Sequence, residues 1–318
     1  MKMTNKPSSQ LMRDIVINSI AKAAEKDKDI LFISADLGAK ALDGFRRDLP
    51  NQFIHAGISE QNMVDLASGL ALSGKKVFLY AMAPFITARC FEQLKCVIAS
   101  MGLPVTLISV GVGLGYDHAT LTHFTPEDIA CMRSLNGIEV LTPSDGESAE
   151  AIIEQAIAVP KFRYIRLDRQ GQPELYHGNF RISQGLGFGH IREGKEIVII
   201  ACGALLQKVL AAQKILKSDG INIGIIDLFR VKPINTLELG SLLRAYRCIL
   251  TVEEQLLDGG MSSAVLEMLA DQNILMPVKR LGMKDGFSVV NGNRDNLHEF
   301  YGIDLENIVE SARELVRD

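Results

Sequence analysis

The chain has 318 residues, of which 47% are hydrophobic and 23% are charged, and its formal net charge is −4 at pH 7. This length exceeds one typical hydrophobic core and fits two globular domains. The small negative charge gives no electrostatic reason to expect nucleic acid or an anionic membrane as a partner. No apolar run reaches the ~20 residues that span a bilayer, so the sequence indicates a globular protein that binds neither.

The cysteines indicate the cellular compartment. Five cysteines are scattered along the chain, at positions 90, 96, 131, 202 and 248. No two of them form a Cys-x-x-Cys pattern, so neither a zinc site nor a disulfide framework is expected. The first ten residues are polar, contain no apolar signal core and are expected to fray. These features predict a cytoplasmic protein with reduced thiols.

The first half of the chain alternates apolar strands with helices. The strands that we expect are 30–34, 53–56, 76–80, 105–110, 138–141 and 164–169. The helices that we expect are 11–26, 63–73 and 83–95, one that begins with a capping box at Thr125, and one that begins at Ser144. This alternation predicts a largely parallel sheet covered by helices.

Residues 170–190 separate this half from a second α/β unit. They hold four glycines and Pro173 without helical or strand periodicity, so we expect a linker followed by a short hairpin. The second unit has expected strands at 196–201, 221–227, 248–252 and 278–281, and expected helices at 205–217, from 259 and at 305–317. The predicted fold is therefore α/β, with two doubly wound domains.

Glu60 stands between a short strand and an apolar helix. The segment 57–62 reads Gly-Ile-Ser-Glu-Gln-Asn, and the small-residue helix 63–73 follows it. A carboxyl group at such a junction, with apolar sequence on both sides, is in a setting that alters its proton affinity. The alternative is an exposed glutamate at a helix start, favoured there by the helix dipole.

Segment 57–62, with Ala-Ser-Gly-Leu-Ala at 67–71, resembles the catalytic-glutamate segment of the transketolase family of thiamine diphosphate enzymes. Further matches are Ile-Arg-Leu-Asp-Arg at 165–169, Ile-Asp-Leu at 226–228, Val-Lys-Pro at 231–233, Thr-Val-Glu-Glu at 251–254 and Gly-Gly at 259–260. The resemblance implies a pyrimidine-binding domain at 1–175 and a smaller transketolase C-terminal-type domain at 190–318. It also implies that Glu60 is catalytic and holds a ring nitrogen of the cofactor's aminopyrimidine.

A complete transketolase carries another domain ahead of the pyrimidine-binding domain. That domain holds the diphosphate through Mg²⁺ and is marked by Gly-Asp-Gly, a motif that is absent from this chain. The resemblance therefore implies the C-terminal subunit of a split transketolase, which shares thiamine diphosphate with a separate N-terminal subunit. Mg²⁺ is expected on that partner, and the expected assembly is a heterotetramer of two copies of each subunit.

The resemblance implies four further cofactor contacts. Asp36 and Leu37 match an Ala-Asp-Leu loop that lies against the thiamine in the family, with the leucine as an apolar wall. Phe85 falls where an aromatic ring packs against the aminopyrimidine, and Met82 replaces a second ring three residues earlier. The alternatives are a turn at the strand end for Asp36 and a core position for Phe85.

Five residues are implied to contact a sugar phosphate substrate. Arg169 matches an arginine that binds the substrate phosphate, and Lys40 can supply a second cation. His123 matches a histidine that donates to a substrate hydroxyl or moves its proton. Compared with the family's loop, two extra residues separate Asp117 from the Thr-His pair at 122–123. His118 can replace either the aspartate or the histidine of that loop. The alternatives are a surface salt bridge for Arg169 and surface positions for the histidines.

The predicted reaction is transfer of a two-carbon ketol unit from a ketose phosphate to an aldose acceptor, carried out with the partner subunit. Arg166, close to Arg169, is expected to form a structural ion pair instead of binding substrate. Two alternatives stay open. The first is the beta subunit of a 2-oxo acid dehydrogenase decarboxylase, whose loop resembles His123 followed by Thr-Pro-Glu. The second is a degenerate subunit that binds the partner without catalysis.

Overall fold

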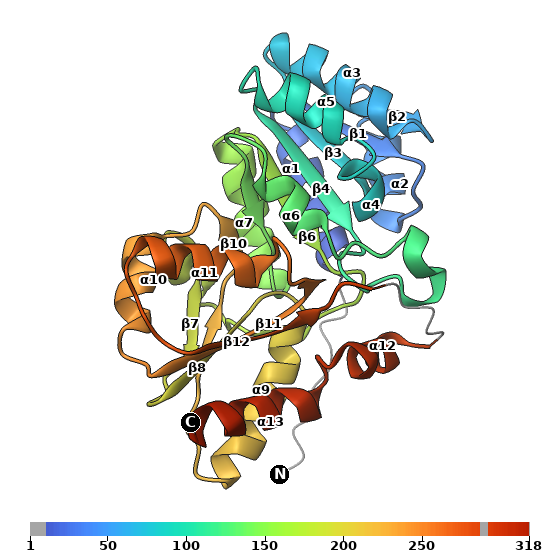
Figure 1. Cartoon of the computed structure of the whole chain (residues 1–318). Helices are drawn as coiled ribbons and strands as arrows, with labels where there is room; N and C mark the ends of the chain where they lie inside the picture. The colour runs from blue at the N-terminus through green and yellow to red at the C-terminus, as the bar shows by residue number, and fades with distance from the viewer. Residues whose placement is uncertain (1–10, 287–291, 318) are drawn as a thin grey trace.

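The computed structural model describes residues 11–286 and 292–317, which form two α/β units, one above the other in Figure 1. The prediction of two α/β units with largely parallel sheets is confirmed. The expectation that the first ten residues fray lies outside the described residues. Within those residues, none of the helices combines the length and apolar composition that crossing a bilayer requires.

The first sheet has seven strands in the order β10-β5-β6-β4-β3-β1-β2, and β10 (Arg230–Lys232) comes from the second half of the chain. Its strands from the first half are β1 (Ile30–Ala35), β2 (Phe53–Gly57), β3 (Lys76–Met82), β4 (Val105–Val110), β5 (Glu139–Leu141) and β6 (Arg163–Leu167). These six run parallel to one another. Every residue of β1, β4 and β6 is buried, as expected for a parallel sheet with both faces covered by helices.

The helices around this sheet begin and end where local hydrogen bonds allow. They are α1 (Met12–Ala24), α2 (Lys40–Asp48), α3 (Glu60–Leu72), α4 (Ala83–Ile86), α5 (Phe91–Gln93), α6 (Asp128–Arg133) and α7 (Gly146–Ala158). Asp145 begins α7 with a capping box, since its Oδ1 accepts the Ser148 N–H at 2.8 Å and Ser148 Oγ accepts the Asp145 N–H at 3.0 Å. Its Oδ2 accepts the Leu175 N–H at 2.8 Å, which ties the linker to the first unit.

The second sheet has the order β12-β11-β8-β9-β7. Its strands are β7 (Gly189–Arg192), β8 (Ile197–Ala201), β9 (Gly224–Asp227), β11 (Cys248–Leu256) and β12 (Val278–Met283). The helices of this half are α9 (Leu205–Ser218), α10 (Thr236–Leu243), α11 (Met261–Asp271), α12 (Arg294–Tyr301) and α13 (Leu305–Arg317). Only β7 is antiparallel to its neighbour among these strands.

Two helix predictions in the first half are wrong. The helix expected at 83–95 breaks at Thr87, where the hydroxyl donates to the Ala83 carbonyl at 2.7 Å, and it resumes as α5 and the π-helix η1 (Leu94–Ala99). The capping box expected at Thr125 does not form, because α6 begins three residues later. The carboxylate of Asp128, which the capping box would use, instead binds the side chain of Arg166.

The linker prediction is also wrong in part. Residues 170–190 contain the short helix α8 (Phe180–Gln184), and β7 pairs with the distant strand β9 instead of forming a local hairpin. The strand β10 (Arg230–Lys232) follows β9 in the chain but joins the edge of the first sheet, antiparallel to β5. The second half of the chain therefore contributes a strand to the first sheet, which interlocks the two units.

Asp227, at the end of β9, gives a prediction about stability. Burial raises the pKa of this carboxyl to about 7, and Tyr176 Oη donates to its Oδ2 at 2.6 Å. Because the folded-state pKa lies above the unfolded value of 3.8, the stability that this group contributes is present at acidic pH and is lost as the pH rises toward 7. We expect this loss to reach about 3 kcal/mol between about pH 5 and about pH 8.

The measurement is urea unfolding of the wild type and of Asp227→Asn across this pH range. The amide cannot ionise and still accepts the tyrosine hydroxyl, so the variant is expected to lack this component of the pH dependence. Identical pH profiles for the two proteins would contradict the assignment.

Candidate active site

The candidate residues gather at one edge of the first sheet. Strands β6, β4, β3, β1 and β2 are consecutive and parallel, so their carboxyl ends meet at this edge, where open α/β sheets bind ligands. Asp36 follows β1, Glu60 follows β2, Phe85 follows β3, the glycine-rich loop 111–118 follows β4, and Arg169 follows β6. The topology thus brings residues from five distant segments to the same edge.

Glu60 is the first residue of α3 and is only 5% exposed, so it is not the exposed glutamate of the alternative interpretation. Its Oε2 accepts a hydrogen bond from Arg89 Nη1 at 2.7 Å. The guanidinium carbon of Arg89 also lies 4.1 Å from the centre of the Phe85 ring. The planar guanidinium of Arg89 is therefore stacked on the Phe85 ring while it donates a hydrogen bond to Glu60.

This arrangement tests whether the site suits the aminopyrimidine of thiamine diphosphate. That ring is planar and needs an aromatic or apolar surface and a carboxyl group at one of its nitrogens. In this structure Phe85 provides an aromatic surface and Glu60 a carboxyl group to the planar guanidinium of Arg89. The side chain of Arg89 is 43% exposed. The residues present therefore fit the cofactor's ring, and in this structure the Arg89 guanidinium occupies the Glu60 carboxylate.

Next to Phe85 lies His123. The two rings are 5.4 Å apart between centroids and meet edge to face, and the centroid of the Tyr116 ring lies 5.8 Å from that of His123. His123 Nδ1 is 2.8 Å from Thr122 Oγ1. Tyr116 packs onto Gly111, where the backbone has φ +79° and an added Cβ would lie 1.9 Å from the tyrosine ring, so this position requires glycine.

Arg169, His118 and Asp117 form the far end of the site. Arg169 Nη1 lies 3.1 Å from His118 Nδ1, and its guanidinium carbon is 4.9 Å from the centre of the Tyr116 ring. Burial alone would raise the pKa of Asp117, but hydrogen bonds from His118 and from the backbone N–H of Arg294 lower it. Arg169 and His118 are exposed, so a cation and an imidazole at this end are open to an anionic ligand.

Four predicted residues lie outside these contacts. Asp36 and His55 are exposed and their side chains lie 3.6 Å apart, while Leu37 is half-buried against the core. Lys40 is exposed at the first position of α2, and Met82 is half-buried at the end of β3. In the described part of the chain, no hydrogen bond or ion pair joins Asp36, Leu37 or Lys40 to Glu60 or Arg169.

Sequence reasoning missed two residues of the site. Arg89 follows Phe85 by four positions, a spacing that would place both side chains on one face of the helix expected at 83–95, and the two side chains stack although that helix breaks at Thr87. Tyr116 belongs to the glycine-rich loop 111–118, and its ring lies between His123 and Arg169. Nothing in the local sequence indicated that its ring would fold back onto Gly111.

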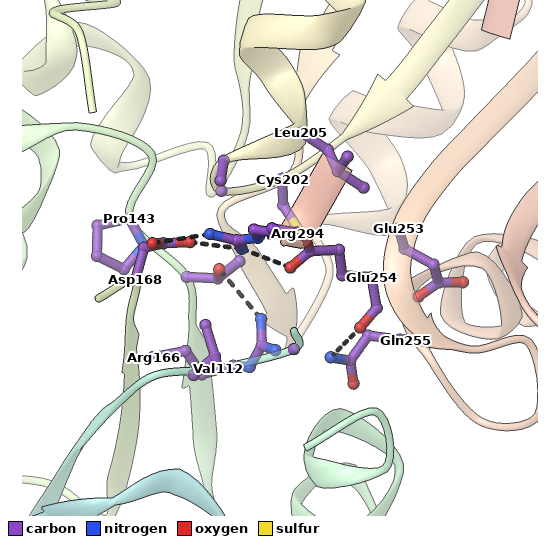
Figure 2. Close-up of a pocket in the computed structure, with 14 residues that line it drawn as sticks. Val112, Pro143, Arg166, Asp168, Cys202, Leu205, Glu253, Glu254, Gln255 and Arg294 are labelled. Atoms are coloured by element: carbon purple, nitrogen blue, oxygen red, sulfur yellow. Dashed lines mark hydrogen bonds and ion pairs between the residues drawn. The ribbon is translucent and has the colours of Figure 1, made fainter. Parts of the chain in front are cut away.

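A cavity between the two units is a separate feature. It has a volume of about 30 Å³, far below the ~300 Å³ of a small-molecule site. Figure 2 shows Asp168 and Glu254 pointing at Arg294 beside it, with Arg166 of β6 on the side of the first unit. Burial raises the pKa of Cys202, which lines this cavity, to about 12, so this thiol is not a nucleophile at neutral pH.

The chain matches two protein families, "Transketolase, pyrimidine binding domain" over residues 8–173 and "Transketolase, C-terminal domain" over residues 189–308. It is 31% identical over 302 residues to one subunit of the apulose-4-phosphate transketolase of Phocaeicola vulgatus, covering 94% of this chain and 96% of the relative. It is 30% identical over 305 residues to a 6-deoxy-6-sulfo-D-fructose transketolase subunit of Clostridium sp., covering 96% of this chain and 94% of the relative.

A solved structure described as "Split gene transketolase, inactive beta4 tetramer" has the same fold, with a TM-score of 0.86 and 29% identity. The match covers 96% of this chain and 98% of that one. These relatives are transketolase chains, the first of the two enzyme classes that the sequence indicates. The chain therefore belongs to the transketolase family, as the subunit of a split transferase that carries the pyrimidine-binding and C-terminal domains.

Proposed function

We propose that this chain supplies the aminopyrimidine-binding and substrate-binding side chains of a thiamine diphosphate-dependent transketolase. In the proposed complex, a separate N-terminal subunit holds the diphosphate and Mg²⁺. The observation that carries the proposal is the buried carboxylate of Glu60 beside the Phe85 ring, at the carboxyl edge of a parallel sheet. Family membership implies the cofactor, and the contacts of Arg89 support its fit.

The surface beside Glu60 supports a partner subunit. Ile58 is 79% exposed, and Leu66, Gly69 and Leu72 recur at three-residue spacing along the exposed side of α3. Apolar side chains exposed together next to a functional group mark an interaction surface. The related split-gene tetramer made of beta subunits alone is described as inactive. We propose that the N-terminal subunit covers this side of α3 and that two copies of each subunit assemble.

Each side chain has a proposed role. Thiamine diphosphate, when bound, supplies the nucleophilic carbon that accepts the two-carbon unit. Glu60 holds a proton at a nitrogen of the pyrimidine ring, and Phe85 and Met82 flank that ring. Asp36 and Leu37 lie against the thiamine. These assignments place the cofactor contacts at the ends of β1, β2 and β3, which are neighbours in the sheet.

The side chains proposed to bind the substrate follow His123 on the side away from Phe85. His123 itself moves protons at the hydroxyl groups of the sugar. Arg169, His118 and Lys40 bind the phosphate of a ketose or aldose phosphate, and Asp117 contacts the sugar. The pairing of Arg169 with His118 at 3.1 Å supports this assignment, because both side chains can donate to one phosphate group. The five cysteines are free, which supports a reducing, cytoplasmic location.

Arg169→Ala tests the phosphate assignment. We expect the KM for a phosphorylated acceptor to rise about 10- to 100-fold, the effect of losing charge-assisted hydrogen bonds. The KM for the same aldose without phosphate is expected to change little. The measurement is steady-state kinetics of the complex with both acceptors, with ketol transfer followed by product analysis.

Arg181→Ala is the matched control, since Arg181 pairs with Glu154 on the surface of α8 and should leave both KM values unchanged. Equal effects of Arg169→Ala on both acceptors would contradict phosphate binding by Arg169. Absence of ketol transfer in the wild-type complex would contradict the proposed activity itself.

A further inference from the structure

Arg294 is the first residue of α12 in the second, C-terminal unit, and its guanidinium donates hydrogen bonds to both halves of the chain. Nη1 and Nη2 donate to the Asp168 carboxylate at 3.0 and 2.7 Å, in a bidentate pair. Nε and Nη2 also donate to Glu254 at 2.6 and 2.5 Å. Asp168 directly precedes Arg169 at the end of β6, so this pair fixes the backbone at the start of the proposed phosphate site (Figure 2).

The backbone of Arg294 makes a second contact with the same site. Its N–H donates to Asp117 Oδ2 at 3.0 Å, and Asp117 directly precedes His118. Glu254, which Arg294 binds, accepts the Leu114 N–H at 3.4 Å. It also packs closely on Gly113, because a Cβ added to that glycine would lie 2.5 Å from Glu254 Oε2. One residue of the C-terminal unit thus touches both segments that end in the Arg169–His118 pair.

The charges around Arg294 make this contact hard to replace. The side chains of Asp168, Glu254 and Arg294 are 4%, 9% and 9% exposed, so the guanidinium neutralises carboxylates that are largely shielded from water. Although burial would raise the pKa of Glu254, Arg294 and His298 hold it well below its usual range. Without the guanidinium, the carboxylates at this junction would repel each other or take up protons.

We infer that Arg294 is a positioning residue of the C-terminal unit that sets the spacing between Arg169 and His118 and thereby the affinity for the substrate phosphate. The inference rests on the proposed function, because it takes Arg169 as a phosphate ligand. The hydrogen bonds of Arg294 to the residues just before Arg169 and His118 carry it. The C-terminal unit then contributes to substrate selection without touching the substrate.

The experiment compares Arg294→Gln and Arg294→Lys in the complex with the partner subunit. For Arg294→Gln we expect the KM for a phosphorylated aldose to rise about tenfold, with kcat within about threefold, while the KM for the unphosphorylated aldose stays within about twofold. The inhibition constant of inorganic phosphate should rise in parallel. Arg294→Lys keeps one charge but loses the bidentate geometry, so it should recover part of the loss.

Two further measurements separate positioning from general damage. Thiamine diphosphate affinity, measured by calorimetry, should be unchanged in the Arg294 variants. Asp295→Asn, at the next position of α12 and paired with Lys208 on the surface, should behave as wild type. If Arg294→Gln does not fold, Arg294→Lys is judged by the same comparison of acceptors.

Equal losses for both acceptors, or no loss in either Arg294 variant, would overturn the inference. The Arg169→Ala variant in the same assay reports on the proposed function. If Arg169→Ala affects only the phosphorylated acceptor and the Arg294 variants do not, the inference fails alone. If Arg169→Ala has no such selectivity, the phosphate site itself is wrong.

Discussion

Replacing Glu60 with glutamine is expected to lower kcat of the complex by about 10²- to 10⁴-fold, the usual contribution of a positioned acid or base. The substitution keeps the size of the side chain and an acceptor for Arg89, which lies 2.7 Å away, but a neutral amide cannot hold the proton that the proposed mechanism needs at the pyrimidine nitrogen. The measurement is kcat at saturating cofactor and substrates.

The matched control is Glu306→Gln. Glu306 also lies in the first turn of a 13-residue helix, α13, but it is exposed, and α13 lies in the lower unit of Figure 1, at the opposite end from α3. Its substitution should leave kcat unchanged. Size-exclusion chromatography of the complex shows whether Glu60→Gln still assembles. An assembled Glu60→Gln complex with more than about a third of the wild-type kcat would support the alternative of a non-catalytic subunit.

The second large effect concerns stability. Arg166 donates to both oxygens of Asp128, at 2.8 and 3.0 Å, and Tyr164 Oη donates to the same carboxylate at 2.6 Å. Burial would lower the pKa of Arg166, but the Asp128 carboxylate outweighs it and raises that pKa. We expect Arg166→Met to lower the free energy of unfolding by about 3–5 kcal/mol, because it leaves a buried carboxylate without its partner.

Urea unfolding measures this effect, and it is large against a typical total of about 5–15 kcal/mol. Arg313→Met, which breaks the half-exposed pair with Asp219, should cost less than about 1 kcal/mol. The double variant Asp128→Leu, Arg166→Met should be more stable than Arg166→Met alone, since no charge stays buried. A loss below about 1 kcal/mol for Arg166→Met would show that the pair is not a structural element.

The strands and the buried position of Glu60 could be predicted because their signals are local. Apolar runs bounded by turn residues marked β1, β4 and β6, and six consecutive residues placed Glu60 between a strand and an apolar helix. The structural ion pair of Arg166 was also predicted, and it forms with Asp128. The sequence did not indicate which carboxylate, and Asp128 was assigned to a capping box.

The rest of the site depends on distant contacts. The expected helix 83–95 breaks at Thr87, where the side chain donates a hydrogen bond to a backbone carbonyl of the preceding turn. Arg89 stacks on Phe85 across this break. The strand β10 is three residues long and joins the first sheet from the other half of the chain. Arg294 reaches Asp168 across 126 positions of sequence, a pairing that no local pattern indicates.

In the proposed function this chain forms only part of a shared cofactor site. The most direct test is calorimetric titration of thiamine diphosphate with Mg²⁺ into this chain alone and into an equimolar mixture with a Gly-Asp-Gly-bearing subunit purified from the source cell. We predict no binding to this chain alone and one cofactor per pair of subunits in the mixture. Saturable binding to this chain alone, or no binding in the mixture, would contradict a cofactor site shared between the two subunits.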